Sequence, residues 1–151
     1  MIYYMKNTYL PSHLTKPDKI NQKKELLKSI KLYKNQKYHT RKKIKSFVSK
    51  SSKHLKKVKT IYNIEPLVIN TNLVKKTGCS KKILKQIIKK GQGAYYSSGS
   101  RPNQSSHSWG LARLASSITG GKSSKVDYHL LKQCEHTKKA YKLAIPSTKH
   151  K

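Results

Sequence analysis

The amino-acid sequence predicts a mainly α-helical protein in which an extended basic arm precedes a small helical domain. Three observations lead to this class. Apolar residues recur at helical spacing in several stretches, capping residues and glycines mark the ends of those stretches, and 34% hydrophobic content over 151 residues is enough for one modest core. We place the arm at residues 1–60 and the domain at residues 61–151, because all 7 glycines and the only tryptophan lie in the second range.

The arm carries 18 Lys and Arg against 2 acidic residues, a net charge of +16, and contains no glycine. After Pro17, the stretch from Asp18 to Tyr33 has apolar residues near helical spacing, and Asp18 suits the positive end of the helix dipole, so we expect a helix there. Residues 34–60 mix basic, Ser and His residues with isolated apolar ones. This pattern favours a segment that is mobile alone in water and becomes ordered on a partner.

The domain is expected to begin with residues 61–73, whose β-branched residues and Pro66 fit either a short strand or hairpin, or an extended lead-in. Capping side chains at 77–80 then precede an amphipathic helix that we expect to end at Gly91, followed by a loop to Gln104. Further helices are predicted from about 105–108 to Gly120, over 127–131, and over 135–144.

The two cysteines, Cys79 and Cys134, are 55 residues apart and form no CxxC motif. We expect them to be reduced thiols of a protein made in the cytoplasm, with no metal site, because the 7 His residues also lack the spacing of a helical metal site. The apolar opening at residues 1–5 is too short for a signal peptide or a membrane span.

Enzymatic motifs are incomplete throughout the chain. Residues 119–123 (Thr-Gly-Gly-Lys-Ser) resemble the end of a P-loop, but Ser116 stands where its first Gly is required, so we interpret them as a helix end. Residues 91–93 lack the third Gly of a dinucleotide motif and are interpreted as a turn. The domain offers few carboxylates for acid–base chemistry. We therefore expect no catalytic residue, cofactor or small-molecule substrate; an enzyme that uses a Cys or His is the weaker alternative.

The net charge of +30, from 35 basic and 5 acidic residues, indicates a polyanionic partner: nucleic acid, an anionic membrane or an acidic protein shell. Arginine is rare beside lysine here, which marks the three arginines for planar, bidentate or stacking contacts. The residues expected to bind the partner are Arg41, Lys42, Lys43, Lys45, Lys56, Lys57, Arg101, Arg113 and Lys122.

The aromatic residues Tyr95, Tyr96 and Trp109 lie near two of these arginines and admit two interpretations. They can stack on nucleobases beside the guanidinium groups. Alternatively, Trp109 and one tyrosine form the small core, and Arg101 or Arg113 pairs with Asp127.

Four sequence motifs carry a family resemblance: Lys75-Lys76-Thr77-Gly78-Cys79-Ser80, residues 91–102, Ser108-Trp109-Gly110-Leu111-Ala112-Arg113-Leu114 and Thr119-Gly120-Gly121-Lys122. In these motifs the chain resembles, over about residues 74–134, an uncharacterised domain of large (giant) DNA viruses and some large tailed phages. The resemblance implies a viral origin, and the lysine-rich arm looks like the basic leader of such viral proteins. It implies no activity.

These observations lead to two hypotheses of function. The first is a minor structural, capsid-associated protein of a large DNA virus, made in the host cytoplasm and located in the virion. There the arm would bind acidic shell proteins or an anionic internal membrane. The alternative is a viral protein that binds DNA or RNA without sequence specificity, in which case counterion release would make binding steeply salt-dependent.

Overall fold

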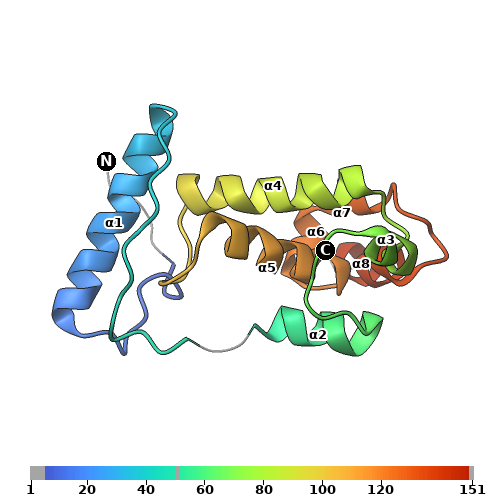
Figure 1. Ribbon diagram of the computed structural model, residues 1–151, viewed down its shortest axis with the longest axis horizontal. Helices are drawn as coiled ribbons and strands as arrows, with labels where there is room; N and C mark the ends of the chain where they lie inside the picture. The colour runs from blue at the N-terminus through green and yellow to red at the C-terminus, as the bar shows by residue number, and fades with distance from the viewer. Residues whose placement is uncertain (1–5, 50–51, 150–151) are drawn as a thin grey trace. The chain divides into compact units, whose positions relative to one another are not determined.

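The computed structural model describes residues 6–49 and 52–149, and within these ranges it contains eight α-helices and no β-strand (Figure 1). The predicted mainly α-helical class is confirmed. The chain divides into two units, each described by itself: unit 1 comprises residues 1–50 and 92–109, and unit 2 comprises 51–91 and 110–151. This division differs from the expected one because 92–109 packs with the N-terminal segment. The apolar opening at 1–5 lies outside the described residues.

Unit 1 is built on α1 (Lys16–Lys34), which confirms the helix expected from Asp18 to Tyr33. The Thr15 hydroxyl caps the helix by accepting a hydrogen bond from the Asp18 amide at 3.3 Å, and Pro17 lies in the first turn, where its missing N–H costs nothing. The buried residues of α1 recur at the helical period and are Gln22, Leu26, Ser29 and Ile30.

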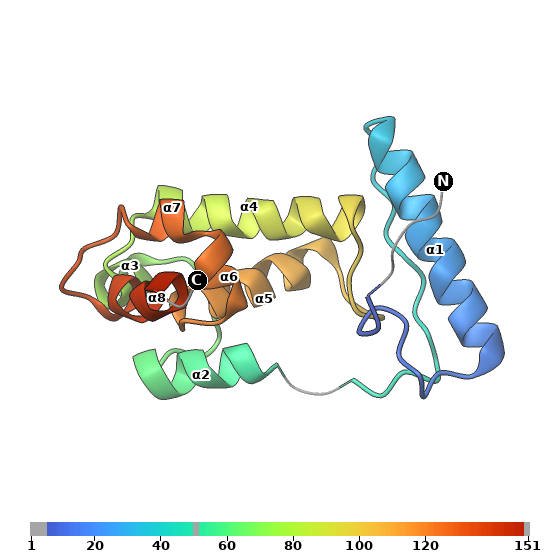
Figure 2. The same ribbon diagram turned by 180° about the vertical axis from the view of Figure 1, so that it is seen from behind.

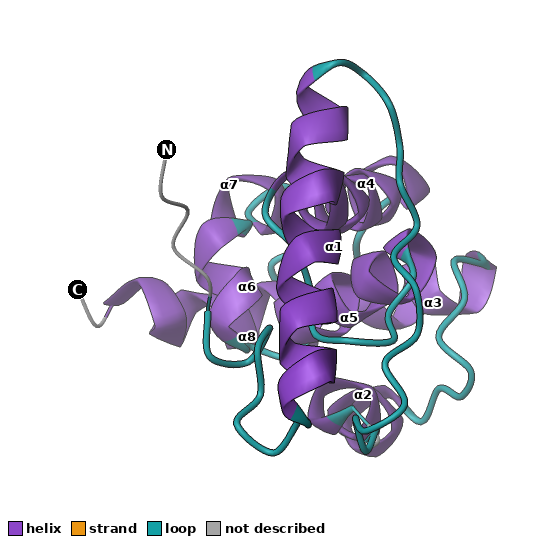
Figure 3. Ribbon diagram, turned by 90° about the vertical axis from the view of Figure 1, so that its left-hand side faces the viewer, coloured by secondary structure: helices purple, strands orange, loops and turns teal. Residues whose placement is uncertain are grey.

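After α1 the chain turns back, and residues 37–49 run beside the helix as irregular backbone (Figure 3). The direction is antiparallel, because the Lys42 amide donates to Glu25 at 2.8 Å while the later Ser46 amide donates to the earlier Asp18 at 2.9 Å. These backbone groups therefore find their partners in side chains and need no strand ladder. Whether this segment is ordered in isolation stays a prediction.

Two helices, α4 (Lys81–Ser97) and α5 (Ser106–Ile118), contribute residues to both units. The expected end of α4 at Gly91 is wrong, as is the turn expected at 91–93, because the helix continues and buries Gly91. The terminating role falls to Gly99, which has φ 114° and donates its amide to Ala94 O at 3.0 Å. A Cβ on Gly99 would also lie only 2.9 Å from Leu26 Cδ2. Both the positive φ and the lack of space therefore require glycine at this position.

Unit 2 encloses an apolar core. Its helices are α2 (Lys53–Tyr62), α3 (Thr71–Thr77), α6 (Lys122–Val126), α7 (Tyr128–Leu131) and α8 (Lys139–Lys149), with parts of α4 and α5. Figure 2 shows α3, α6, α7 and α8 gathered together. Leu73, Leu84 and Ile118 are fully buried there. Within the described ranges no helix has both the length and the apolar character to cross a bilayer.

Residues 61–73 do not form the short strand considered above. Residues 61–62 end α2, residues 63–70 form an irregular connection that begins with Asn63 at φ 55° and bends at 65–66, and the Asn70 side chain caps α3 by accepting from the Leu73 amide at 2.9 Å. This connection turns Ile64 and Leu67 into the apolar core. The range 61–73 is therefore neither a strand nor an extended lead-in throughout, because its last three residues begin α3.

The C-terminal part follows the predictions in outline. Gly120, with φ 74°, ends α5, and this confirms the interpretation of 119–123 as a helix end. The short helix expected at 127–131 is found as α7. The helix expected at 135–144 begins later, at Lys139, and continues past Pro146. The first residues of that range form a turn, in which the Lys138 amide donates to Glu135 O at 3.1 Å, while the Glu135 amide donates to Gly78 O at 2.9 Å.

Cys79 and Cys134 form a disulfide, which overturns the expectation of two reduced thiols. The turn between α3 and α4 meets the segment after α7 closely here. Gly78, with φ 73°, is so near that an added Cβ would lie 2.7 Å from Lys138 Cγ. The pairing depends on this tertiary approach, which a separation of 55 residues does not reveal.

Candidate functional site

Exposed lysines on α1 lie on the face opposite its buried residues. Lys24, Lys28 and Lys31 are exposed and follow one another at spacings of one helical turn, so their side chains share a face. In unit 2, the exposed lysines of α4 are Lys81, Lys82, Lys85, Lys89 and Lys90. Like charges one turn apart destabilise a helix, and a bound anion relieves that repulsion. These rows therefore favour anion binding.

The few carboxylates are engaged within the fold. Asp18 and Glu25 bind the returning segment, Glu65 lies 3.5 Å from Lys59 Nζ, and Asp127 is buried against Arg113. Four of the 5 acidic residues of the chain thus already have partners. Because 35 basic residues face so few acids, most of the positive charge has no carboxylate in the chain to balance it.

Contacts with residues 37–49, the segment that returns along α1, lower the pKa values of Asp18 and Glu25. Hydrogen bonds from the Ser46 hydroxyl and amide hold the pKa of Asp18 below its ordinary value. Partial burial acts to raise the pKa of Glu25, but the Lys42 amide and the His39 ring outweigh it, so this pKa is also lowered. The His39 Nε2 lies 3.0 Å from Glu25 Oε2. Both carboxylates therefore stabilise unit 1 in their ionised form.

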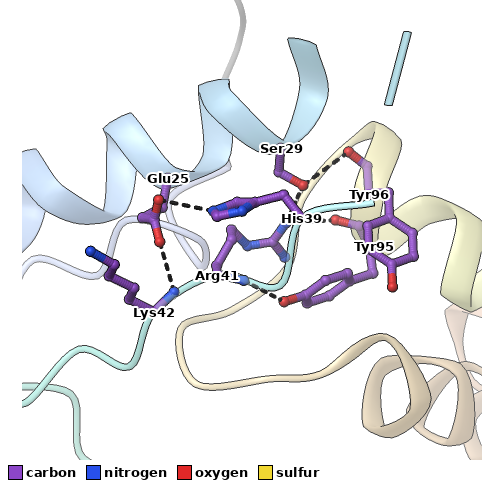
Figure 4. Close-up of polar contacts among 7 residues, drawn as sticks. All are labelled: Glu25, Ser29, His39, Arg41, Lys42, Tyr95 and Tyr96. Atoms are coloured by element: carbon purple, nitrogen blue, oxygen red, sulfur yellow. Dashed lines mark hydrogen bonds and ion pairs between the residues drawn. The ribbon is translucent and has the colours of Figure 1, made fainter. Parts of the chain in front are cut away.

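A polar cluster centred on Arg41 joins the parts of unit 1 (Figure 4). Its Nη1 donates to Ser29 Oγ at 3.0 Å and to the Tyr95 carbonyl at 2.7 Å, and its Nη2 donates to Ser100 Oγ at 2.6 Å. The guanidinium carbon lies 3.8 Å from the centroid of the Tyr95 ring, whose hydroxyl accepts the Arg41 amide at 3.2 Å. One side chain thus joins α1, the returning segment and α4.

Arg41 is only 8% exposed, so it belongs to the interior of unit 1 and not to the exposed basic surface. Burial lowers the pKa of its guanidinium, although the nearby Tyr95 and Glu25 oppose that effect. An arginine remains charged in this setting, and its planar fork supplies several donors at once. The expected stacking and multidentate contacts of a rare arginine are found, but they are made within the chain.

A row of four tyrosine rings begins at Tyr95 in this cluster and continues outward. We call Tyr95, Tyr96, Tyr33 and Tyr38 the tyrosine ladder. Tyr95 is fully buried and meets Tyr96 edge-on, with ring centroids 5.0 Å apart. Tyr96 in turn stacks on Tyr33 at 6.0 Å and lies 5.1 Å from Tyr38. Tyr38 is 69% exposed, so the ladder runs from the interior of unit 1 to its surface.

The other two arginines differ in their surroundings. Arg113 forms a bidentate ion pair with Asp127, at 3.0 and 2.7 Å, and Ser117 donates to the same carboxylate at 2.7 Å. This confirms the alternative in which Arg113 pairs with Asp127. Arg101 is exposed. Trp109 is half-buried and meets the Tyr9 ring edge-on at 6.0 Å, so the expectation of a core tryptophan is wrong. The Tyr95 side chain is fully buried in unit 1.

The expected lysines are exposed but belong to different units. Unit 1 contains Lys42, Lys43 and Lys45, and unit 2 contains Lys56, Lys57 and Lys122. Sequence reasoning missed the roles of Ser29, Ser100 and Tyr38, for which no local pattern exists. It also missed Glu25, for which a signal was present: a carboxylate is so rare in this chain that each one merits a partner. In the described part of the chain, no three His, Cys, Asp or Glu side chains gather to hold a metal ion.

The fold and this surface together define a small helical protein whose exposed lysines outnumber its carboxylates. The chain belongs to a family described as a family of unknown function (DUF5824), which matches residues 8–135. The match includes most of the basic arm as well as the motifs at 74–134, so that arm is part of the family's domain. We found no match among curated proteins or among solved structures.

Proposed function

We propose that this chain is a non-enzymatic polyanion-binding protein, a minor structural component of a large DNA virus that attaches to acidic surfaces of the particle. Its partners would be acidic shell proteins or an anionic internal membrane. The observation that supports the proposal is the uncompensated positive charge. The chain has 35 basic and 5 acidic residues, and four of these acids already contact groups of the chain itself. The sequence resemblance to viral domains supports the location in a virion.

The proposed mechanism uses many weak contacts instead of one tight site. An exposed Lys–carboxylate pair contributes about 0–1 kcal/mol, so affinity would come from the number of lysines engaged. The summed positive field would also speed the encounter with an acidic surface. Both effects are screened by salt, with a Debye length of about 8 Å at physiological ionic strength.

The binding test uses the full-length protein and fluorescein-labelled polyglutamate, with fluorescence anisotropy measured over a series of salt concentrations. We expect affinity to fall steeply with salt. A variant with Lys24→Glu, Lys28→Glu and Lys31→Glu should bind more weakly and with a smaller salt slope. The matched variant with three Lys→Arg changes keeps the charge and should bind like the wild type. Equal binding by the Glu and Arg variants would contradict the role of the α1 row.

The particle test is quantitative mass spectrometry of purified virions before and after shell removal. The proposal predicts a fixed ratio of this protein to the major shell protein and its loss with the shell. Retention with the genome would instead favour the second candidate, a nucleic-acid-binding protein. The observation that favours this candidate is an exposed tyrosine within the basic unit 1, because aromatic faces and lysines together bind single strands.

A further inference from the structure

We propose that Tyr38, the exposed end of the tyrosine ladder, is a stacking platform for a base of single-stranded nucleic acid. The inference rests on the second candidate function, nucleic-acid binding, and names a single strand as the ligand of unit 1. Tyr96, which is half-buried, contacts the Tyr38 ring at an interplanar angle of 55°.

The Tyr38 ring contacts two other aromatic rings, although the residue is 69% exposed. Its centroid lies 5.1 Å from that of Tyr96 and 5.9 Å from that of Tyr33, so two aromatic neighbours support it. Tyr96 is anchored in turn, because its carbonyl accepts a hydrogen bond from the Ser29 hydroxyl at 3.4 Å. A ring ordered before binding loses little conformational entropy when a base stacks on it.

The backbone beneath Tyr38 is a hydrogen-bonded turn at the end of α1. The Lys37 amide donates to Leu32 O at 2.9 Å, and Gln36 has φ 59°, which closes the helix and reverses the chain. Lys37 is exposed and adjacent to Tyr38 in the chain, so a cation and an aromatic face are presented by neighbouring residues. A nucleotide likewise combines a phosphate with a base.

The positive charge of unit 1 and the exposed tyrosine together favour single-stranded nucleic acid as the ligand. Unit 1 contains 15 Lys and Arg against 2 acidic residues, a net charge of +13, which suits a phosphate backbone. An acidic protein surface would satisfy the lysines but offers no flat partner for an exposed tyrosine. In a duplex the bases are already stacked on one another, so only a single strand can present a base to Tyr38.

The experiment measures binding of the full-length protein to three labelled probes of equal length: single-stranded oligothymidylate, an abasic single strand and a DNA duplex. We expect oligothymidylate to bind more tightly than the abasic strand. Tyr38→Ala should weaken oligothymidylate binding by at least about fivefold and leave the other two probes unchanged, because it removes one base-stacking contact. Tyr38→Trp should retain the preference, since it keeps an aromatic face.

Val48→Ala is the matched control, because Val48 is also 69% exposed in unit 1 but has no ring. It should leave all three affinities unchanged. Circular dichroism checks that each variant is folded. If the wild type binds oligothymidylate and the abasic strand equally, the stacking inference fails while polyanion binding survives. If it binds neither the three probes nor polyglutamate at physiological salt, both proposals fail.

Discussion

Unit 2 and unit 1 differ in what fills their interiors. The continuous hydrophobic cluster of the described chain lies in unit 2, where Leu84, Leu114 and Leu131 are fully buried, and the Cys79–Cys134 disulfide adds a covalent link. Unit 1 buries fewer large apolar side chains and places the charged Arg41 among them. Apolar contacts are non-directional and many residues share them, whereas the hydrogen bonds of one guanidinium depend on a single residue. The order of unit 1 should therefore depend on Arg41 more than unit 2 depends on any one of its apolar side chains.

Removing the disulfide should have the largest effect, and it should fall on unit 2. The bond joins residues 55 apart, and the chain-entropy model assigns a link of this span about 4 kcal/mol of stability. Guanidinium unfolding of the wild type and of the Cys79→Ser, Cys134→Ser double variant measures the loss. A difference below about 1 kcal/mol would mean that the apolar cluster alone maintains unit 2.

Arg41→Met should destabilise unit 1 by about 3 kcal/mol, because it leaves Ser29, Ser100 and the Tyr95 carbonyl without their charged donor. Hydrogen exchange should show the loss of protection at the amides of residues 37–49. Lys42→Met is the matched control, since its side chain is exposed, and it should change stability by less than about 0.5 kcal/mol. Equal effects of the two changes would remove Arg41 as the centre of unit 1.

Acid should weaken unit 1 through Asp18 and Glu25. Both carboxylates have a lowered pKa in the folded chain, so their contribution is present above the ordinary carboxylate pKa values of 3.8 and 4.5 and is lost as the pH falls through the lowered ones. Hydrogen exchange of residues 37–49, compared at pH 5 and pH 3 after correction for intrinsic rates, measures this loss. The Asp18→Asn, Glu25→Gln variant should show a smaller pH dependence; an unchanged one would contradict the assignment.

The smallest effect is expected for Glu65→Gln in unit 2. The Lys59–Glu65 pair is exposed on both sides, with 61% and 69% of the side-chain surfaces accessible, so water and salt screen it. The free energy of unfolding should change by less than about 0.5 kcal/mol. Asp127→Asn, which disrupts the buried pair with Arg113, provides the contrast and should cost several times more.

Several features of the fold and of the site follow from local sequence. The helix after Pro17 and the end of α5 at Gly120 were predictable because helical spacing, capping and positive φ act over a few residues. The rarity of arginine indicated the stacking contact of Arg41 and the bidentate contact of Arg113, but not that both are made within the chain. Gly91 was misread because burial against neighbouring elements overrode its weak local preference for a helix end.

The amino-acid sequence by itself determined the charge balance, the helical class and the approximate starts of α1, α4, α5 and α7, because each depends on composition or on neighbours within one or two turns. Only the tertiary structure decided that Cys79 pairs with Cys134, and that Arg41 lies inside unit 1. Arg41 meets the Tyr95 carbonyl and Ser100 across 54 and 59 residues of chain. Contacts of that range depend on how whole elements pack, and no local spacing encodes them.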